Sequence, residues 1–365
     1  MFVVEGSCNQ ATVFSELRDE GAIRQIKEIC SDEEYKNAVI KVMPDYHPGK
    51  GCVIGLTMRM PADGIVNPNF VGVDIGCGIL AVKLSKRPNL SDLDDICHRN
   101  IPSGFYFHKE PVSGKAAEYI ESLKKKVDDC YKLERQLGTL GSGNHFIELD
   151  ELNNEYYLVI HSGSRNVGLQ VAESYARDYE EGHLDMASYL HDMQIMQQYA
   201  AENRKVMASI ITKRLKVDIE DSIESVHNYI ELLDDSFMVR KGAIRAQADE
   251  KCVIPLNMRD GTIIGIGKGN DEWNQSAPHG AGRAIGRSQA FKQLSLDKFE
   301  QTMKGVYSTT VCKGTLDEAP MAYKPSKYIL SEINDTVEVI GIMKSIFNFK
   351  DASVKAKRRT DRRNR

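Results

Sequence analysis

Several common features are missing from this chain of 365 residues, and each absence narrows the class of protein. No run of about 18 apolar residues occurs, so we expect no membrane-spanning helix. The N-terminus has no charged stretch followed by a long apolar one, which argues against a secretory signal. None of the eight cysteines belongs to a Cys-x-x-Cys pair. Scattered cysteines indicate reduced, mostly buried thiols and a cytoplasmic location.

An excess of one charge is also missing, because 48 lysines and arginines face 52 acidic residues and the net charge is −4. The overall charge therefore does not indicate nucleic acid, and a polyanion-binding role would need a local basic cleft. One local excess occurs near the C-terminus, where Lys355 to Arg365 contains seven cations and a single acid, Asp361. We interpret residues 351–365 as a solvated basic tail, which can still attract phosphate groups.

Hydrophobic patterning favours one α+β domain over residues 1–350, with a helical insertion at about 169–233. Helices are expected at 113–137, at 169–233 with a break near 216–218, and at 281–304. Apolar runs predict strands, with the first of them ending at Pro44: 38–43, 53–60, 156–161, 243–246, 252–255 and 262–267. Periodicity does not decide whether 337–349 is a strand or a helix.

Residues 71–78 read Val-Gly-Val-Asp-Ile-Gly-Cys-Gly and contain the most informative pair of side chains, Asp74 and Cys77. A carboxylate and a thiol three residues apart on a glycine-flanked turn can reach one metal ion or share two. An aspartate in such a turn is more often a turn residue, and a single cysteine more often a core residue. Metal binding therefore needs further ligands elsewhere in the chain.

Five of the nine histidines supply such candidates, because they lie in motifs of small and polar residues: His47, His145, His161, His227 and His279. For the other four we expect surface or structural roles: His98, His108, His183 and His191. Imidazoles combined with a carboxylate and a thiolate suit Mn²⁺, Zn²⁺ or Fe²⁺. Ligands so widely spaced must be assembled by the fold, unlike those of a zinc finger. The competing interpretation is that each histidine is a satisfied core or turn residue.

Two glycine-rich segments are suited to binding phosphate groups. Residues 276–283 place His279 before glycines at the start of a predicted helix, where free N–H groups can bind an anion and Arg283 can add a bidentate donor. A histidine at this position could attack a phosphorus centre. Residues 138–144 form a second glycine loop, although such a loop alone is more often a turn. Neither segment is a Walker motif.

Taken together, these motifs resemble the RtcB family of GTP-dependent RNA ligases. They occur in the family's order and are specific only jointly: Pro44-Asp45-x-His47-Pro48-Gly49-x-Gly51, Val73–Gly78, Gly138–Phe146 with Glu148, His161–Arg165, His227-Asn228, Lys241–Ala246, His279–Arg283 and Glu318–Lys324. The resemblance implies a single compact α+β domain with mixed sheets around a central metal cleft.

The resemblance also implies a role for each matching residue. The expected ligands of two Mn²⁺ ions are Asp74, Cys77, His145, His161 and His227, with Cys77 bridging. His279 is the expected nucleophile that takes GMP, while Asp45 and Arg165 are expected near the reacting RNA ends. The expected guanosine site contains Asn144, Phe146, Glu148, Asn257, Thr262, Gly280, Ala281, Gly282, Arg283, Tyr323 and Lys350.

The implied reaction has three steps. His279 attacks the α-phosphate of GTP, and pyrophosphate leaves. A 2′,3′-cyclic phosphate RNA end is opened to a 3′-phosphate, which receives the GMP. A 5′-hydroxyl RNA end then attacks and expels GMP. An archease-like activator or a release-factor-like partner is possible on this interpretation, and membrane association is not expected. The alternatives are a cyclic phosphodiesterase without ligation and a non-catalytic RNA-binding scaffold.

The chain departs from the family pattern in four places. It is shorter than typical members, and residues 256–262 replace a serine-rich segment near the guanine. Ala277-Pro278 precedes His279, where a cysteine is often found. Lys350 is followed by Asp351 and the basic tail rather than by glycine and the chain end. These departures suit a shorter bacterial paralogue branch associated with repair of damaged RNA.

Overall fold

Two large β-sheets organise the chain in this computed structural model, which describes residues 1–353. The six-stranded sheet has the spatial order β1 (Phe2–Glu5), β2 (Gln10–Val13), β3 (Val39–His47), β4 (Ile54–Pro61), β10 (Ser236–Lys241) and β9 (Asn228–Leu232). The seven-stranded sheet has the order β12 (Lys251–Asn257), β13 (Gly261–Gly267), β15 (Val337–Phe349), β6 (Phe146–Leu152), β7 (Glu155–Ser162), β5 (Gly78–Leu84) and β8 (Ile219–Val226). A short pair joins β11 (Ala243–Arg245) to β14 (Ser276–Pro278).

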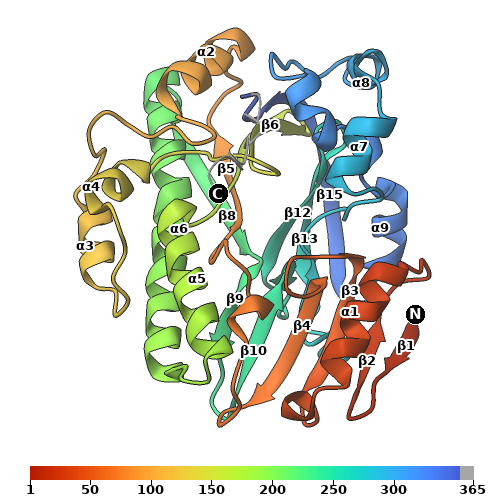
Figure 1. Ribbon diagram of the computed structural model, residues 1–365. Helices are drawn as coiled ribbons and strands as arrows, with labels where there is room; N and C mark the ends of the chain where they lie inside the picture. Colours follow the sequence, from red (N-terminus) through yellow and green to blue (C-terminus); the bar gives the residue numbers. More distant parts are fainter. Residues whose placement is uncertain (354–365) are drawn as a thin grey trace, which may run out of the picture.

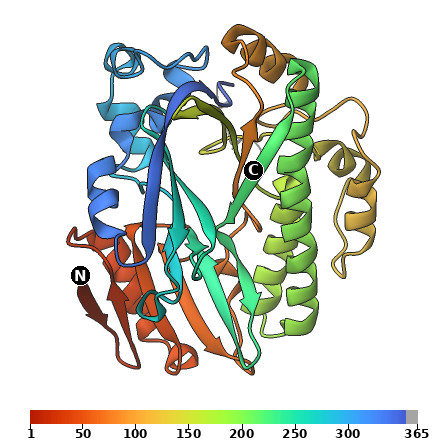
Figure 2. The same ribbon diagram turned by 180° about the vertical axis from the view of Figure 1, so that it is seen from behind.

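The seven-stranded sheet curls into a half-barrel, as the view from behind shows (Figure 2). Its two edge strands approach each other, and Val253 N on β12 donates a hydrogen bond to Ser225 Oγ on β8 at 3.0 Å. Apolar side chains that include Ile79 and Val159 fill the inner face. Because side chains on a strand alternate between its faces, His161 on β7 points the same way as Val159. The curl therefore directs His161 inward, at the end of its strand.

Helices cover the outside of the sheets (Figure 1). The long helices α5 (Arg165–Glu180) and α6 (Met186–Leu215) run side by side, and Met207 and Ile211 of α6 pack against the outer face of β5 and β7. The other helices are α1 (Glu20–Cys30), α2 (Leu90–Asn100), α3 (Lys115–Glu121), α4 (Cys130–Leu133), α7 (Arg287–Gln293), α8 (Leu296–Thr302) and α9 (Ser326–Glu332). None of the helices in residues 1–353 is long and apolar enough to cross a membrane.

A single α+β domain with mixed sheets is confirmed, but the prediction of one helix over 113–137 is wrong. The chain leaves the helical conformation after α3 because the buried carboxylate of Asp192 accepts hydrogen bonds from Lys124 N and Lys125 N, at 2.7 and 2.8 Å. Asp129 then adopts a left-handed conformation with φ of 58° before α4. Tertiary hydrogen bonds thus override the helix-forming composition of this segment.

Three other boundaries also differ from the prediction. The helical part of the insertion ends at Leu215, and residues 219–232 form strands β8 and β9. Residues 281–286 are irregular, and the helical structure predicted for 281–304 is confined to α7 and α8. Strand β3 continues through Pro44, because its pairing with β4 is interrupted between Val42 and His47 and needs no N–H there. Residues 337–349 form strand β15. Of the predicted basic tail, 351–365, only residues 351–353 are described, and the cations of the tail lie outside the described residues.

Candidate active site

A cavity of about 610 Å³ opens between the half-barrel, the loop that follows β14, and the segment before α9. Most of the predicted site residues line it: Asp74, Cys77, Asn144, Phe146, Glu148, His161, His227, Asn257, His279, Gly280, Ala281, Gly282, Arg283, Tyr323 and Lys350. Residues more than 270 positions apart therefore meet at one site. The fold brings the predicted metal, nucleophile and guanosine residues into a single cavity.

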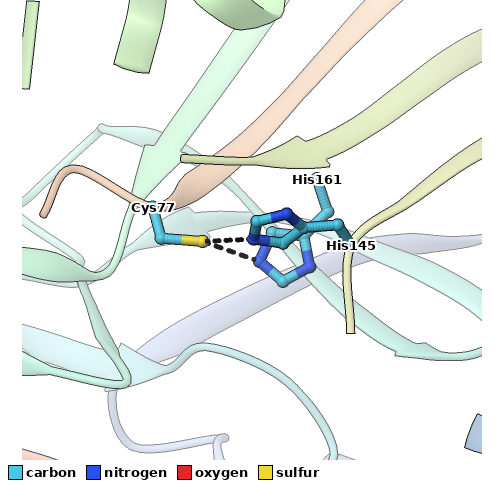
Figure 3. Close-up of side chains that lie close together, drawn as sticks. All are labelled: Cys77, His145 and His161. Atoms are coloured by element: carbon cyan, nitrogen blue, oxygen red, sulfur yellow. Dashed lines mark hydrogen bonds between the residues drawn. The ribbon is translucent and has the colours of Figure 1, made fainter. Parts of the chain in front are cut away.

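The metal candidates meet at their ligand atoms (Figure 3). Cys77 Sγ lies 3.4 Å from His145 Nε2 and 3.2 Å from His161 Nε2, and all three residues are buried. Two further predicted ligands extend the cluster. His145 Nε2 is 2.9 Å from Asp74 Oδ2, and His161 Nε2 is 3.4 Å from His227 Nε2. Five candidate ligand atoms from four separate segments thus face a common space.

The opposite ring nitrogens explain why this arrangement fits a cation. His145 Nδ1 donates to Leu140 O at 2.9 Å, and His161 Nδ1 donates to Asn144 O at 3.1 Å. In a neutral imidazole the Nε2 atom then carries a lone pair, which is the arrangement of metal-bound histidines. Burial lowers the pKa of His161 well below its ordinary value, so this ring is neutral. The Nε2 lone pairs therefore lie close to a sulfur and a carboxylate, and a divalent cation between these electron-rich atoms would bind all of them.

The charges of the other cluster members agree with this interpretation. Burial lowers the pKa of His227 well below its ordinary value. Burial also opposes ionisation of Asp74, but its contact with His145 Nε2 outweighs burial and holds the pKa of that carboxyl at about 2 in the metal-free chain. A metal ion would take the place of the proton between these two atoms. Burial raises the pKa of the Cys77 thiol well above its ordinary value. A thiolate at Cys77 would therefore need a nearby cation, and a metal ion supplies one.

Close backbone packing fixes Asp74 in the cluster. Ser164 N donates to Asp74 Oδ1 at 3.0 Å, just after β7 ends. A Cβ atom on Gly163 would lie 2.1 Å from the same carboxylate oxygen, so only glycine fits there. The motif His-Ser-Gly-Ser at the end of β7 thus meets two requirements. The strand end supplies one candidate ligand, His161, and Gly163 leaves room for a second, Asp74, from another loop.

The predicted nucleophile lies at the edge of this cluster. His279 follows β14 directly, and its ring centroid is 4.9 Å from that of His227. His279 Nδ1 lies 2.6 Å from Oδ2 of Asp45, a fully buried carboxylate on β3. The two atoms are in ion-pair contact without hydrogen-bond alignment, and a proton on Nδ1 beside this carboxylate would leave the lone pair on Nε2, the nitrogen available for attack. Gly282 presses against the Asp45 carbonyl, where a Cβ would lie 2.0 Å from the oxygen.

Glu318 is a site residue to which the sequence assigned no role, although it begins one of the matching motifs. Its buried carboxylate binds the cations on one wall of the cavity. Oε1 lies 2.6 Å from Arg287 Nη1, and Oε2 accepts from Tyr323 OH at 2.6 Å and from Lys350 Nζ at 3.1 Å. Burial opposes ionisation, but Lys350 and the arginines outweigh it and hold the pKa of Glu318 at about 2. The wall is thus fixed by one central carboxylate.

Lys350 contacts both this wall and the backbone that carries the candidate metal ligands, which we call the metal cluster. Its Nζ donates to Asn144 O and His145 O, at 3.2 and 3.4 Å, and lies 5.3 Å from the centre of the Phe146 ring. The carbonyl of Asn144 also accepts from His161 Nδ1. The short segment 144–146 therefore touches both the metal candidates and the predicted guanosine side of the cavity.

Four predicted residues lie outside the lining of this cavity, and one of them, His145, reaches it through its contacts with Cys77 and Asp74. Asp45 reaches it only through His279. Arg165 begins α5 with φ of 58°, and its guanidinium donates to Thr139 Oγ1 and to Gly104 O. Thr262 lies on β13, buried beside Asp150. The structure does not bring Thr262 to the cavity, and it places Arg165 behind the cluster, near Asp74.

Two buried carboxyl groups lie on β6. Asn348 Nδ2 donates to Glu148 Oε1 at 2.5 Å. Burial raises the pKa of Glu148 well above its ordinary value, and the nearby carboxyl of Asp150 raises it further. Burial raises the pKa of Asp150 to about 8, although the hydroxyls of Thr262 and Ser345 oppose the rise. At neutral pH the ligand-free chain therefore holds Asp150 mostly protonated.

This pair predicts a pH dependence of stability. A carboxyl whose pKa is higher in the folded chain than in the unfolded one destabilises the fold as pH rises between the two values. From pH 4 to 8, we expect Asp150 to lower the free energy of unfolding by up to about 1.4 kcal/mol per pH unit. Asp150→Asn should flatten this slope in urea unfolding experiments on the ligand-free protein. Glu151→Gln, on the same strand but partly exposed, should keep it, and an unchanged slope in Asp150→Asn would contradict the assignment.

Comparisons with known proteins give matches over most of the chain. A family model described as tRNA-splicing ligase RtcB matches residues 25–132 and 120–351. The RNA-splicing ligase RtcB of Escherichia coli strain K12 is 30% identical over 84% of this chain and 88% of its own length. The tRNA-splicing ligase RtcB of Aeropyrum pernix is 26% identical over 78% of this chain and 81% of its own. That of Thermococcus kodakarensis is 25% identical over 82% and 84%.

Proposed function

The chain belongs to the RtcB family and is an RNA ligase, and from this premise we propose that it joins RNA ends with GTP through a covalent histidine–GMP intermediate. One observation supports this proposal above the others. His279 has one ring nitrogen 2.6 Å from the buried carboxylate of Asp45 and lines the same cavity as the metal cluster. A histidine held in this way is a nucleophile ready for a phosphorus centre.

In the first step, His279 Nε2 forms a bond to the α-phosphorus of GTP, and the bond to pyrophosphate breaks. Asp45 holds the proton on Nδ1 and stabilises the positive charge that the ring gains. The residues that would hold Mn²⁺ are Asp74, Cys77, His145, His161 and His227. Bound there, the metal would offset negative charge on the reacting phosphate.

The wall organised by Glu318 supports a guanosine nucleotide on the far side of His279. Arg283 and Arg287 contact Glu318 and line the cavity, so they can also donate to phosphate oxygens. Phe146 offers an apolar surface, and Glu148 can accept hydrogen bonds from the guanine edge when it is ionised. Binding of the guanine base would therefore require the neutral carboxyl of Glu148 to lose its proton. These features support GTP as the nucleotide.

The remaining steps concern RNA. We propose that a 2′,3′-cyclic phosphate end is opened to a 3′-phosphate, which takes GMP from His279. A 5′-hydroxyl end then attacks this activated phosphate and releases GMP. Repair or splicing of RNA in the cytoplasm, with an archease-like or release-factor-like partner, would suit this chemistry. The alternative, a phosphodiesterase without ligation, needs neither the His279–Asp45 pair nor the basic wall, and no observation favours it.

Guanylylation of the protein tests the proposal. The purified chain is incubated with Mn²⁺ and α-labelled GTP and then separated by denaturing electrophoresis. We expect a labelled band that is labile to acid and stable to alkali, as a phosphoramidate is, and no band with labelled ATP. Parallel reactions should convert an RNA pair with 2′,3′-cyclic phosphate and 5′-hydroxyl ends into a joined product. A folded, metal-loaded protein that opens the cyclic phosphate without any labelled band would support the phosphodiesterase instead.

A further inference from the structure

Exposed aromatic side chains gather in one part of the surface that the reaction does not explain. Four of the six exposed large aromatic side chains within residues 1–353 are Phe105, Tyr106, Phe107 and Tyr131. Phe105 is 90% exposed and Tyr106 is 71% exposed. Rings this exposed add nothing to the core, and a gathered apolar patch of this kind marks an interaction site. We call residues 105–107 the aromatic ridge.

The ridge is held by its backbone rather than by its rings. On one side Gly104 N donates to Gly141 O at 2.8 Å, and on the other His108 N donates to Arg135 O at 3.0 Å. His108 Nε2 also contacts Gly138 O at 3.0 Å. The loop between α2 and α3, on the α6 side of the molecule in Figure 1, is thus fixed at both ends. A fixed loop can present its rings with a small loss of conformational entropy on binding.

The same loop contacts the active site. Gly104, the residue before the ridge, accepts a hydrogen bond from Arg165 Nη2 at 3.3 Å. Arg165 lies near Asp74 of the metal cluster, and Gly141 belongs to the glycine loop that leads to His145. The backbone that carries the ridge is therefore linked to the predicted metal ligands through a single side chain, that of Arg165.

Positive charge accompanies the rings. Lys132 Nζ lies 5.7 Å from the centre of the Phe107 ring, and the guanidinium of Arg135 lies 3.5 Å from that of Tyr131. Two acids lie close to the ridge: Glu110 contacts Arg135 at 3.6 Å, and Asp351 accepts a hydrogen bond from Ser103 Oγ at 3.4 Å, beside Gly104. Exposed rings with cations beside them are features by which proteins bind single-stranded nucleic acid, because bases stack on rings and cations attract phosphates.

On the basis of the proposed ligase function, we propose that the aromatic ridge is a stacking platform for unpaired bases of the RNA substrate, next to the end that is joined. Phe105 and Tyr106 would each stack on a base, and Lys132 would contact the backbone. Duplex RNA hides its base faces and would gain little from these rings. The ridge would thus favour RNA ends that lie in single-stranded loops or overhangs.

The test compares binding of two fluorescent RNAs of equal length, one single-stranded and one duplex, by anisotropy. For Phe105→Ala/Tyr106→Ala we expect the Kd for single-stranded RNA to rise at least about tenfold, with little change for the duplex. The KM for single-stranded RNA in ligation should rise in parallel, with histidine–GMP formation unchanged. The swapped variant Phe105→Tyr/Tyr106→Phe keeps both rings and should bind like the unmodified chain, as should Leu232→Ala, an exposed apolar residue elsewhere.

Equal losses for both RNAs, or no loss, in the double alanine variant would overturn the platform. So would a variant that keeps its RNA binding but loses binding to vesicles of anionic phospholipid. Failure of the proposed function looks different: the unmodified chain would form no adduct with GTP, whatever the ridge variants bind. The two ideas can therefore fail separately in the same set of experiments.

Discussion

Replacement of His279 by alanine should abolish the covalent GMP adduct, with labelling at least about 1,000-fold below that of the unmodified chain. The side chain supplies the only atom proposed to bond to phosphorus, so nothing in the variant can replace it. Metal content should change little, because His279 is the neighbour of His227 rather than one of the predicted ligands. The measurement is adduct formation with α-labelled GTP, together with metal analysis of the same sample.

Asp45→Asn tests whether the carboxylate beside His279 contributes to the reaction separately from the attacking nitrogen of His279. An amide can still contact His279 Nδ1 but cannot stabilise the charge that the ring gains, so we expect adduct formation to slow by about 100-fold or more without vanishing. His183→Ala, which removes a solvent-exposed histidine, serves as the control and should label fully. Full labelling of His279→Ala would refute its role, and normal rates in Asp45→Asn would show that the buried carboxylate does not act through the ring.

Replacement of Cys77 by alanine should remove the metal and the chemistry together. Its sulfur lies within 3.4 Å of both His145 Nε2 and His161 Nε2, so it occupies the centre of the ligand set. Loss of outer hydrogen bonds alone costs about 10–100-fold in metal affinity, and loss of a direct ligand should cost at least as much. We expect Mn²⁺ affinity to fall about 100-fold or more, and guanylylation to fall with it.

Titration with Mn²⁺, followed by metal analysis and the labelling assay, measures both effects. Cys130→Ala is the matched control, because that residue is exposed and is not among those that line the cavity. Its metal content and labelling should equal those of the unmodified chain. A Cys77→Ala protein that stays fully metallated and labels with GTP would exclude the sulfur from the site and leave the imidazoles and Asp74 as the ligands.

Much of the site could be predicted from the sequence because its residues lie in short motifs that need glycine. Gly163 is required beside Asp74, and Gly282 beside Asp45, so the glycines marked the places where chains approach closely. The sequence could not show which side chains would meet. Glu318 carried no signal of its own, since its role comes from Arg287, Tyr323 and Lys350, which converge only in the folded chain.

The fold was predicted less well where tertiary contacts decide the local structure. The segment after α3 has helix-forming residues, but Asp192 takes the backbone N–H groups that a helix would use. The helix prediction included strand β8 because the stretch 169–233 has helix-forming composition, little glycine and no proline. In the structure Ile223 and Ser225 of β8 are buried and Glu224 between them is exposed, which is the alternation of a strand. Its pairing with β5, over Gly78 to Leu84, gives this segment the partner that its composition did not reveal.

The metal cluster also has a consequence for how the chain reaches its folded state. In the half-barrel Ile79 is paired with His161, and His161 with Phe146, so His145, Cys77 and His161 come together only when β5, β6 and β7 are aligned in this register. A slip of one residue would turn His161 to the helix-covered face. Uptake of metal during refolding would thus report correct alignment of three strands, and molecules with a misaligned sheet would be distinguishable from native ones by their failure to retain the ion.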